Sequence, residues 1–209
     1  KEVWKWKNES GDQIINQLKK LGCSCDWSRN RFTMDKDLSQ AVIKTFVKLY
    51  REKIIYKDTK LVNWDTKLET AISDLEVEQR EVQSQLYYIK YKIDSENNYL
   101  TIATTRPETL LGDAAVAVNP NDVRYKHYIG KNIIVPIVER KVKIISDEYV
   151  SQDQGSGALK VTPAHDFNDF EIGKRHKLEF INIFQKDGKL NKNVPKDLVG
   201  LDRFEARKV

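Results

Sequence analysis

Two stretches of this sequence concentrate side chains that could do chemistry. The first is Gly155–Arg175, which reads GSGALKVTPAHDFNDFEIGKR. In it, Lys160 and Thr162 end a short apolar segment, and Asp166 and Asp169 follow three residues apart. A cation, a hydroxyl and two carboxylates at a junction of strand, loop and helix form a polar cluster of the kind that binds or transforms a ligand.

The two aspartates also have a simpler explanation. Asp166 and Asp169 are typical of a helix N-terminus, where one residue caps the helix and an acidic residue lies in its positive first turn. Spacing alone favours this capping role and leaves a functional role open. The flanking glycines do not indicate a phosphate-binding loop, because GSGALK lacks the four-residue spacer before Gly-Lys-Ser/Thr.

The second stretch is Thr104–Thr109, which reads TTRPET. The proline after Arg106 disfavours helical angles for the arginine and holds it extended. Thr105 and Thr109 place hydroxyls close to this cation, a combination that suits an anionic or hydroxyl-bearing ligand. The plainer alternative is a strand end whose arginine pairs with a surface carboxylate.

A mostly helical segment precedes these clusters. Ser10–Gln13 is a capping-box pattern that opens a helix, and Gly22 is its natural end. A second helix is predicted from Asp37 onward, because apolar residues recur at helical spacing. The apolar stripes of both helices indicate core packing rather than a partner groove. Leu61–Trp64 are expected to be extended.

After about residue 78 the pattern changes to short strands separated by polar turns. Alternation in Tyr87–Ile93 and its return in Tyr99–Thr105 predict a hairpin. Further strands are expected at Ala114–Val118, Ile133–Val138 and Val142–Ile145. The expected fold is therefore mixed α/β: a mainly antiparallel β-barrel with peripheral helices, preceded by a helical segment.

Composition narrows the class of protein. The chain has 209 residues, of which 40% are hydrophobic and 32% charged, as in a folded protein with a charged surface. The net charge of +5 permits a nucleic-acid partner, although a solvated lysine-rich surface explains it equally well. No apolar run approaches the ~20 residues of a membrane span, so no membrane partner is expected.

The cysteines and histidines argue against a disulfide and a metal site. Cys23 and Cys25 are separated by one residue, which is poor geometry for an unstrained disulfide. A reducing compartment is therefore expected, and the cytoplasm fits. His127, His165 and His176 are too scattered to form a zinc site. We expect no metal.

Together the two clusters carry a resemblance. TTRPETLLGDAAVAVNPNDVRY and, further on, GSGALKVTPAHDFNDFEIGKRH closely resemble the editing domain of valyl-tRNA synthetase. LGCSCDWSRNRFTMD and LVNWDTKLETAISDLEVE resemble the segment that leads into it. The resemblance covers nearly the whole chain and implies two parts: residues 1–78 as a helical connective segment and residues 79–209 as the editing domain. Leu111–Asp113 and Asp166–Phe170 favour the valyl enzyme over its isoleucyl and leucyl sisters, which remain an alternative.

The resemblance implies a proofreading function. Threonine is nearly isosteric with valine, and a hydrophobic valine pocket rejects it by only about a hundredfold, valyl-tRNA synthetase itself being the usual illustration. The implied reaction is hydrolysis of threonyl-tRNA(Val). The HIGH and KMSKS signatures are absent, so no valine activation and no cofactor are expected, with ATP and Mg²⁺ left to a synthetic domain. The expected partners are the threonine-carrying acceptor end of tRNA(Val) and the rest of the synthetase, of which this chain, expected to be monomeric, is a piece.

The resemblance also implies a set of site residues. The catalytic set is Lys160, Thr162, Asp166 and Asp169, and the substrate-binding set is Thr105, Arg106, Thr109, Asp166 and Asp169. Asp166 is assigned to the α-ammonium group and Asp169 to the threonine hydroxyl. Arg106 and Lys160 suit a phosphate or the developing oxyanion. Thr109 and Thr162 are assigned to orienting the ester or a water molecule that attacks it directly, while His165 is expected to be structural.

Two other functions fit the same sequence. A non-catalytic module could use the polar clusters only to hold the 3′ end of a tRNA. A free-standing editing factor is less compatible with the helical lead-in, Lys1–Leu75. Deacylation by the chain separates the first alternative from an enzyme.

Overall fold

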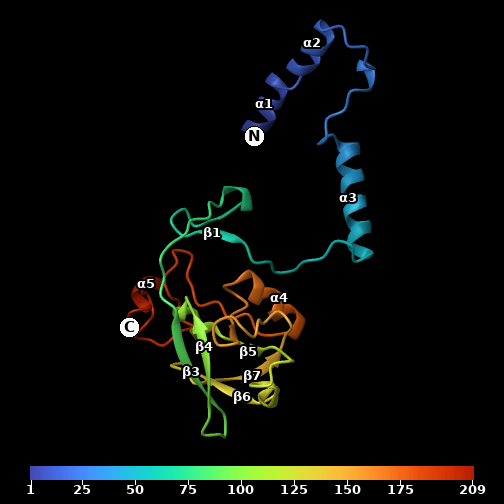
Figure 1. The fold of residues 1–209 in the computed structure, drawn as a ribbon. Helices are drawn as coiled ribbons and strands as arrows, with labels where there is room; N and C mark the ends of the chain where they lie inside the picture. Colours follow the sequence, from blue (N-terminus) through green and yellow to red (C-terminus); the bar gives the residue numbers. More distant parts are fainter. The chain divides into compact units, whose positions relative to one another are not determined.

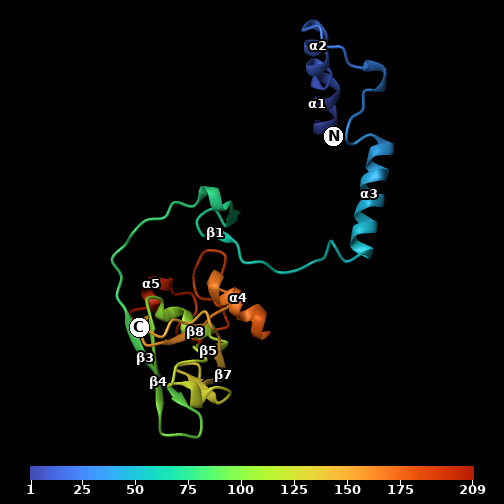
Figure 2. The same cartoon turned by 45° about the vertical axis from the view of Figure 1, so that its right-hand side comes forward.

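A computed structural model describes the chain from residue 1 to residue 209 and is drawn in Figures 1 and 2. The chain forms two compact units, Lys1–Asp58 and Thr59–Val209. This division lies earlier than the boundary near residue 78 that the change of residue pattern suggests. Residues 59–78 belong to the second unit, where the indole Nε1–H of Trp64 donates a 2.8 Å hydrogen bond to the carbonyl oxygen of Lys186.

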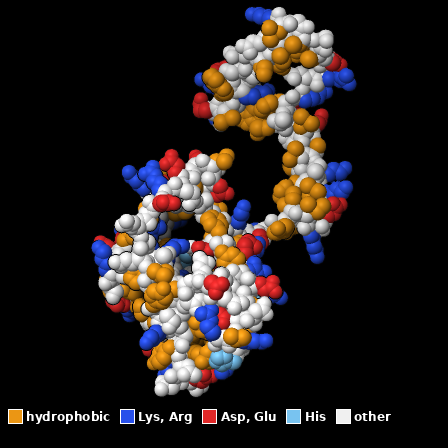
Figure 3. All heavy atoms as spheres, viewed as in Figure 1, with side chains coloured by type: hydrophobic (Ala, Val, Ile, Leu, Met, Phe, Trp, Pro, Cys, Tyr) orange, Lys and Arg blue, Asp and Glu red, His pale blue; other side chains and the backbone are white.

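The first unit is helical but has no core of its own. Its helices are α1 (Glu2–Ser10), α2 (Gln13–Lys20) and α3 (Lys36–Arg51), and none of them buries a residue. The expectation that their apolar stripes are core is therefore wrong: Ile14 and Phe46, for example, are 63% and 54% exposed. Hydrophobic side chains are visible on the surface of these helices in Figure 3. The stripes are exposed because no other element of the unit covers them.

Two further details of the helices differ from expectation. The capping box expected at Ser10–Gln13 does not form, because Ser10 ends α1 and the side chain of Asp12, the N-cap residue of α2, makes no capping hydrogen bond. The chain does turn at Gly22, which has a positive φ of 76°. No helix of the chain has both the length and the apolar character that crossing a membrane requires.

The second unit begins with a small antiparallel hairpin. Strand β1 (Asn63–Asp65) pairs with β2 (Thr70–Ile72), and a 3-10 turn, Asp74–Glu76, follows. The extended segment expected at Leu61–Trp64 overlaps β1. The helices of residues 1–78 therefore all lie before residue 52, apart from the 3-10 turn at Asp74–Glu76.

A six-stranded sheet forms the body of the second unit, in the order β4-β3-β6-β7-β5-β8. All neighbours are antiparallel except β5 and β7, which are parallel. The Cα atoms of the edge strands β4 and β8 approach within 8 Å, so the sheet curves into a nearly closed barrel. The expected mixed fold with a mainly antiparallel barrel is confirmed. The strands are β3 (Tyr87–Ile93), β4 (Tyr99–Thr104), β5 (Ala115–Val118), β6 (Asn132–Val135), β7 (Arg140–Ser146) and β8 (Ala158–Val161).

Strand β5 shows how the barrel separates its two faces. Successive side chains of a strand point to opposite faces. Val116 and Val118 lie in the main core with the other inward residues of the barrel. Ala115 and Ala117 belong to a second cluster with Ile172 of α4 (Phe167–His176). The small alanines therefore let α4 pack closely against the outside of the sheet (Figures 1 and 2).

A buried ion pair joins the C-terminal end of the second unit to the turn that follows β4. Glu108 lies in the 3-10 turn Pro107–Gly112, and its side chain is fully buried. Arg207, just after α5 (Arg203–Ala206), donates to both carboxylate oxygens, at 2.7 Å from Nε and 2.8 Å from Nη2. A bidentate arginine satisfies this carboxylate better than a single donor could. The pair fixes the turn that follows Arg106.

We predict that Arg207→Ala lowers the free energy of unfolding by about 3 kcal/mol, because it leaves the Glu108 carboxylate buried and unpaired. Urea unfolding of the 209-residue chain measures this change. The double variant Glu108→Gln/Arg207→Ala should recover part of the loss. The matched control is Arg80→Ala, whose partner Glu78 is 77% exposed in its side chain, and which should change stability little. Equal effects of the two single variants would contradict the anchoring role of Arg207.

Candidate active site

The two polar clusters of the sequence meet where β4 and β8 approach each other. A cavity of about 190 Å³ lies there, which we call the inner cavity. It receives side chains from the end of β4 and the turn after it, and from β8 and the start of α4. Every expected site residue lines it: Thr105, Arg106, Thr109, Lys160, Thr162, Asp166 and Asp169.

A fully buried carboxylate, that of Asp113, organises the floor of this site. The hydroxyl of Tyr91 donates to its Oδ2 at 2.6 Å, and the hydroxyl of Thr162 donates to its Oδ1 at 2.8 Å. The Nζ of Lys160 lies 3.4 Å from Oδ1 and donates to the Thr162 hydroxyl oxygen at 2.6 Å. Burial raises the pKa of Asp113, and the charge of Lys160 opposes this shift. The lysine and the threonine are therefore held by a common anchor.

Neither Asp113 nor Tyr91 was foreseen as a site residue. Tyr91 lies on the apolar face of an alternating strand, where a buried phenol needs a hydrogen-bond partner. Asp113 precedes the all-apolar segment Ala115–Val118, in which all four residues are completely buried. A carboxylate beside such a segment is a signal that could have been used, since a buried charge needs partners.

The two aspartates at the start of α4 have different hydrogen-bond partners. Asp166 is the N-cap: its Oδ1 accepts the backbone N–H groups of Asn168 and Asp169, at 2.9 and 3.2 Å. The Asp169 side chain instead points back to β8, where its Oδ2 accepts the N–H of Thr162 at 2.8 Å. The simple explanation thus holds for Asp166 as the cap and for the place of Asp169 in the first turn of α4, but it does not account for the bond from Asp169 to Thr162. Each carboxylate keeps a second oxygen with no partner in the chain.

Burial raises the pKa of Asp169 to about 6. The hydrogen bond from the Thr162 N–H and the charge of Lys160 oppose this shift without cancelling it. The residue is only 6% exposed, so its charged form loses most of its hydration. At neutral pH the group is an ionised, poorly solvated acceptor beside an open cavity.

Arg106 is fixed at the rim of the inner cavity. Its Nη1 donates to the carbonyl oxygen of His165 at 2.7 Å, and its Nε lies 3.9 Å from Glu108. The Thr109 hydroxyl donates to the Arg106 carbonyl at 2.9 Å and is almost fully buried. Thr109 therefore stabilises the turn that presents the arginine, and its hydroxyl hydrogen is already engaged. Thr105, in contrast, is exposed at the rim.

His165 acts as a structural acceptor. Its Nε2 accepts the backbone N–H of Ile183 at 3.0 Å, and its ring packs edge-on against Phe184. Burial, with the charges of Arg106 and Lys160, lowers its pKa to about 4. The imidazole is therefore neutral at physiological pH, and the ring joins the site to residues 181–184.

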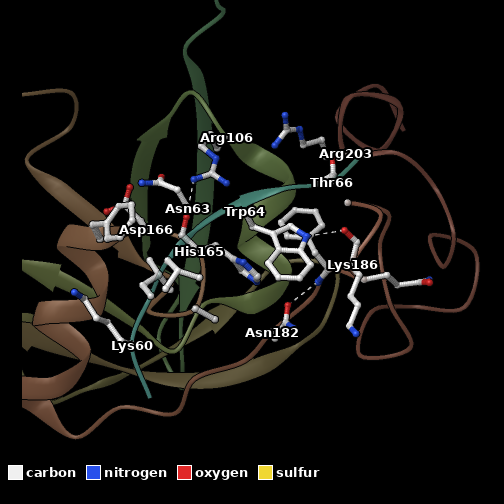
Figure 4. Close-up of a pocket in the computed structure, with 17 residues that line it drawn as sticks. Lys60, Asn63, Trp64, Thr66, Arg106, His165, Asp166, Asn182, Lys186 and Arg203 are labelled. Carbon is white, nitrogen blue, oxygen red and sulfur yellow. Dashed lines mark hydrogen bonds between the residues drawn. The ribbon is translucent and has the colours of Figure 1, made fainter. Parts of the chain in front are cut away.

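A larger cavity, of about 620 Å³, adjoins the first one, and we call it the outer cavity. It shares Arg106, His165 and Asp166 with the inner cavity. Its other walls come mainly from residues 60–66, which include β1, and from residues 182–188, with Arg203 of α5 also in the lining (Figure 4). No pattern in the sequence indicates this cavity, because its walls are far apart along the chain. No group of three or more His, Cys, Asp or Glu side chains in the structure could hold a metal ion.

Comparison with known sequences places this geometry in context. The model of the family described as "tRNA synthetases class I (I, L, M and V)" matches residues 1–194. The valine–tRNA ligase of Pelagibacter ubique (strain HTCC1062) is 65% identical over 207 residues, covering 99% of this chain and 24% of that ligase. The valine–tRNA ligase of Syntrophotalea carbinolica is 58% identical over 205 residues, covering 98% and 23%. The chain thus spans about a quarter of the length of the curated relatives it matches.

Among solved structures, the crystal structure of the ternary complex of Agrobacterium radiobacter K84 agnB2 LeuRS-tRNA-LeuAMS matches with a TM-score of 0.43 and 17% sequence identity. That match covers 86% of this chain and 32% of the LeuRS chain.

We predict that Asp169→Asn stabilises the chain at pH 7 by up to about 3 kcal/mol. The folded-state pKa is about 6, above the ordinary value of 3.8, so the folded protein binds the extra proton more tightly than the unfolded chain does. The aspartate therefore loses stability as pH rises from about 4 to about 6, whereas asparagine, which does not titrate, does not. Urea unfolding at pH 4, 5, 6 and 7 measures the difference between the two proteins. A difference that is constant over this range would contradict the raised pKa.

Proposed function

Because the chain belongs to the class I tRNA synthetases of the isoleucine, leucine, methionine and valine group, we propose that it is the editing part of a valine–tRNA ligase. In this proposal the inner cavity hydrolyses the ester of threonine with tRNA(Val) and spares the valyl ester. The observation that supports it most directly is that one cavity is lined by both polar clusters, with an unpartnered oxygen of a buried carboxylate at its wall.

Discrimination between threonine and valine is assigned to Asp169. Its free oxygen can accept the threonine hydroxyl while the other oxygen stays bonded to the Thr162 N–H. Valine has a methyl group at that position, so it would leave a buried, ionised acceptor without a partner. Such an unsatisfied group costs about 1–3 kcal/mol when neutral and more when charged. A site built to bind a hydroxyl therefore rejects a substrate that lacks one. A hydrophobic pocket, in contrast, cannot strongly reject a substrate of the same shape that carries an additional hydroxyl.

The α-ammonium group of the substrate is assigned to Asp166. One of its oxygens is used in capping α4, and the other has no partner in the chain. An ammonium at this oxygen would form a charge-assisted hydrogen bond. The two carboxylates would then hold the amino acid at two points, which fixes the direction of the ester carbonyl.

The hydrolytic step needs a water molecule and a cation near the carbonyl oxygen. The water oxygen attacks the carbonyl carbon, and the terminal ribose oxygen leaves and takes up a proton, giving free threonine and tRNA. Lys160 is the better candidate for the oxyanion, because Asp113 and Thr162 hold its ammonium group inside the cavity. Arg106, at the rim and partly exposed, suits a phosphate of the tRNA end.

The proposed partners follow from this reaction. They are the acceptor end of a tRNA and the remainder of the ligase, since the curated relatives are about four times as long as the chain. Aminoacylation itself, with its ATP and Mg²⁺, is assigned to parts of the ligase outside this chain. We propose that the chain carries out its hydrolysis without a cofactor and as a monomer.

We predict that the chain releases threonine from threonyl-tRNA(Val) at least ~10-fold faster than valine from valyl-tRNA(Val). The difference corresponds to the cost of leaving the Asp169 oxygen unpaired. Release of each radiolabelled amino acid, corrected for hydrolysis without protein, measures the two rates. Binding of both charged tRNAs without any release above background would instead support a non-catalytic module that holds a tRNA 3′ end.

We predict that Asp169→Ala abolishes the preference for threonine and lowers threonine release by at least ~100-fold. The variant removes both the hydroxyl acceptor and the bond that fixes the end of β8. Asp169→Asn separates these two roles, because it can still accept the Thr162 N–H but lacks the charge. The control is Asp187→Asn, an exposed acidic residue outside both cavities. Threonine release by Asp169→Ala at the rate of the control would refute the assignment.

A further inference from the structure

The connection between β7 and β8 borders the inner cavity, yet none of its residues has a part in the proposed reaction. It comprises residues 147–157, which we call the β7–β8 loop. Tyr149 of this loop lines the inner cavity and does not line the outer one. The residue is 54% exposed, and its hydroxyl makes no hydrogen bond within the chain. Both the ring and the hydroxyl are therefore available to a substrate.

The beginning of the β7–β8 loop is anchored to α4. The Asp147 carboxylate accepts the backbone N–H of Tyr149 at 3.0 Å, and the Nη2 of Arg175 donates to it at 2.9 Å. The residue after Tyr149, Val150, is 5% exposed and packs in the second core cluster with Ile172 of α4. Tyr149 thus lies close to two anchored residues, which restrict the backbone that carries its ring.

The rest of the β7–β8 loop is held by the segment between β5 and β6, and above all by Arg124. The Nε and Nη2 of Arg124 donate to the two oxygens of the Asp122 carboxylate, at 2.9 and 2.6 Å. The same Nη2 donates to the carbonyl oxygen of Gln152 at 2.7 Å. Asp122 is only 1% exposed, so it fixes the guanidinium from the protein side. The next residue, Tyr125, adds a hydrogen bond from its hydroxyl to the Ser156 carbonyl oxygen at 2.8 Å.

Two glycines allow the loop to come this close to its neighbours. Gly157 has a φ of 78°, and a Cβ at this position would overlap the guanidinium of Arg124. Gly155 has a φ of 61°, and a Cβ there would lie 3.1 Å from the Cβ of Ala103 on β4. Side chains rarely adopt such positive φ values, whereas glycine does so readily. Since Ala103 also lines the inner cavity, the loop reaches from β8 to β4 beside it.

We propose that Tyr149 contacts the esterified nucleoside in the inner cavity, and that Arg124 is a positioning residue that holds Tyr149 there by fixing the β7–β8 loop. The proposal rests on the proposed function for the identity of the ligand. Arg124 lines neither cavity, so it acts on the substrate only through the loop. A ring whose backbone is fixed in advance loses less conformational entropy when it contacts a ligand.

The contact is expected to affect binding rather than the chemical step. The groups assigned to the hydrolysis are Lys160, Asp166 and Asp169, and none of them is bonded to the β7–β8 loop. Tyr149 would therefore bind the substrate and the transition state about equally. An interaction of this kind lowers KM and leaves kcat unchanged.

The test is a double-mutant cycle in the 209-residue chain, with Tyr149→Ala, Arg124→Ala and the double variant. Arg124→Lys is made as well, because it keeps a positive charge beside the buried Asp122 and takes the place of Arg124→Ala in the cycle if that variant does not fold. Urea unfolding establishes that each variant is folded. The matched controls are Tyr99→Ala, also 54% exposed, and Lys131→Ala, which removes a 2.6 Å ion pair outside both cavities.

Two ligands are used. Threonyl-tRNA(Val) gives kcat and KM for the release of threonine. An analogue of threonyl-adenosine with a stable amide in place of the ester gives a Kd by calorimetry, and this measurement does not depend on hydrolysis.

We expect Tyr149→Ala to raise both KM and the Kd of the amide by about tenfold, as for the loss of one aromatic contact, with kcat unchanged. Arg124→Ala should raise the same two quantities. The double variant should be no worse than Tyr149→Ala, because the position of the loop has no effect once the ring is absent. Arg124→Lys should not restore binding, since one ammonium group cannot replace the planar fork that holds Asp122 and Gln152 together. The controls should match the unmodified chain.

Unaltered KM and Kd in Tyr149→Ala would overturn the proposed contact. If the effects of Tyr149→Ala and Arg124→Ala multiplied in the double variant, the two residues would act independently and the positioning role would be wrong. A lower kcat with unchanged KM in Arg124→Ala would also contradict it. The proposed function fails separately: if the unmodified chain releases no threonine while the Kd of the amide depends on both residues as expected, the inner cavity binds the ligand but does not hydrolyse the ester.

Discussion

The buried carboxylate of Asp113 is the interaction on which the site and the closure of the barrel both depend. It accepts from Tyr91 on β3 and from Thr162 at the end of β8, and it faces the ammonium group of Lys160. Its backbone carbonyl, with that of Leu111, accepts from the guanidinium of Arg140 on β7. A charge in a dry environment is tolerated only when such donors surround it, so these elements must be in place together. The site is therefore a consequence of how the barrel closes.

The strands and the residues of the inner cavity could be predicted because the patterns that indicate them are local, each lying within a short stretch of sequence. Alternation in Tyr87–Ile93 follows from a barrel with one face buried, and β3 has those bounds. Lys160, Thr162 and Asp169 are close in sequence, so a strand followed by a turn and a helix brings them together. Spacing did not predict that Arg106 lies in the same cavity as these residues. Only the resemblance of both stretches to one family indicated this. The comparisons support that family over residues 1–194.

The other features of the fold and the site depend on contacts between distant parts of the chain, and no periodic pattern in a single sequence indicates such contacts. Tyr91 and Asp113 are 22 residues apart, and Trp64 and Lys186 are 122 apart. The prediction that the apolar stripes of the helices in the first unit are core was wrong for a related reason. Periodicity shows which face of a helix is apolar, but it does not show whether the same segment supplies something to cover it. Ile14 and Phe46 are exposed for that reason.

The approach of β4 to β8 has a consequence beyond the site it encloses. An open sheet has two free edges whose unpaired amides and carbonyls can recruit a strand from another molecule. Here the two edge strands, β4 and β8, lie against each other. The proposed ligand enters the inner cavity between them. The same curvature that leaves room for a substrate thus protects the domain against intermolecular strand pairing, and mutations that widen the gap would be expected to expose both edges to aggregation.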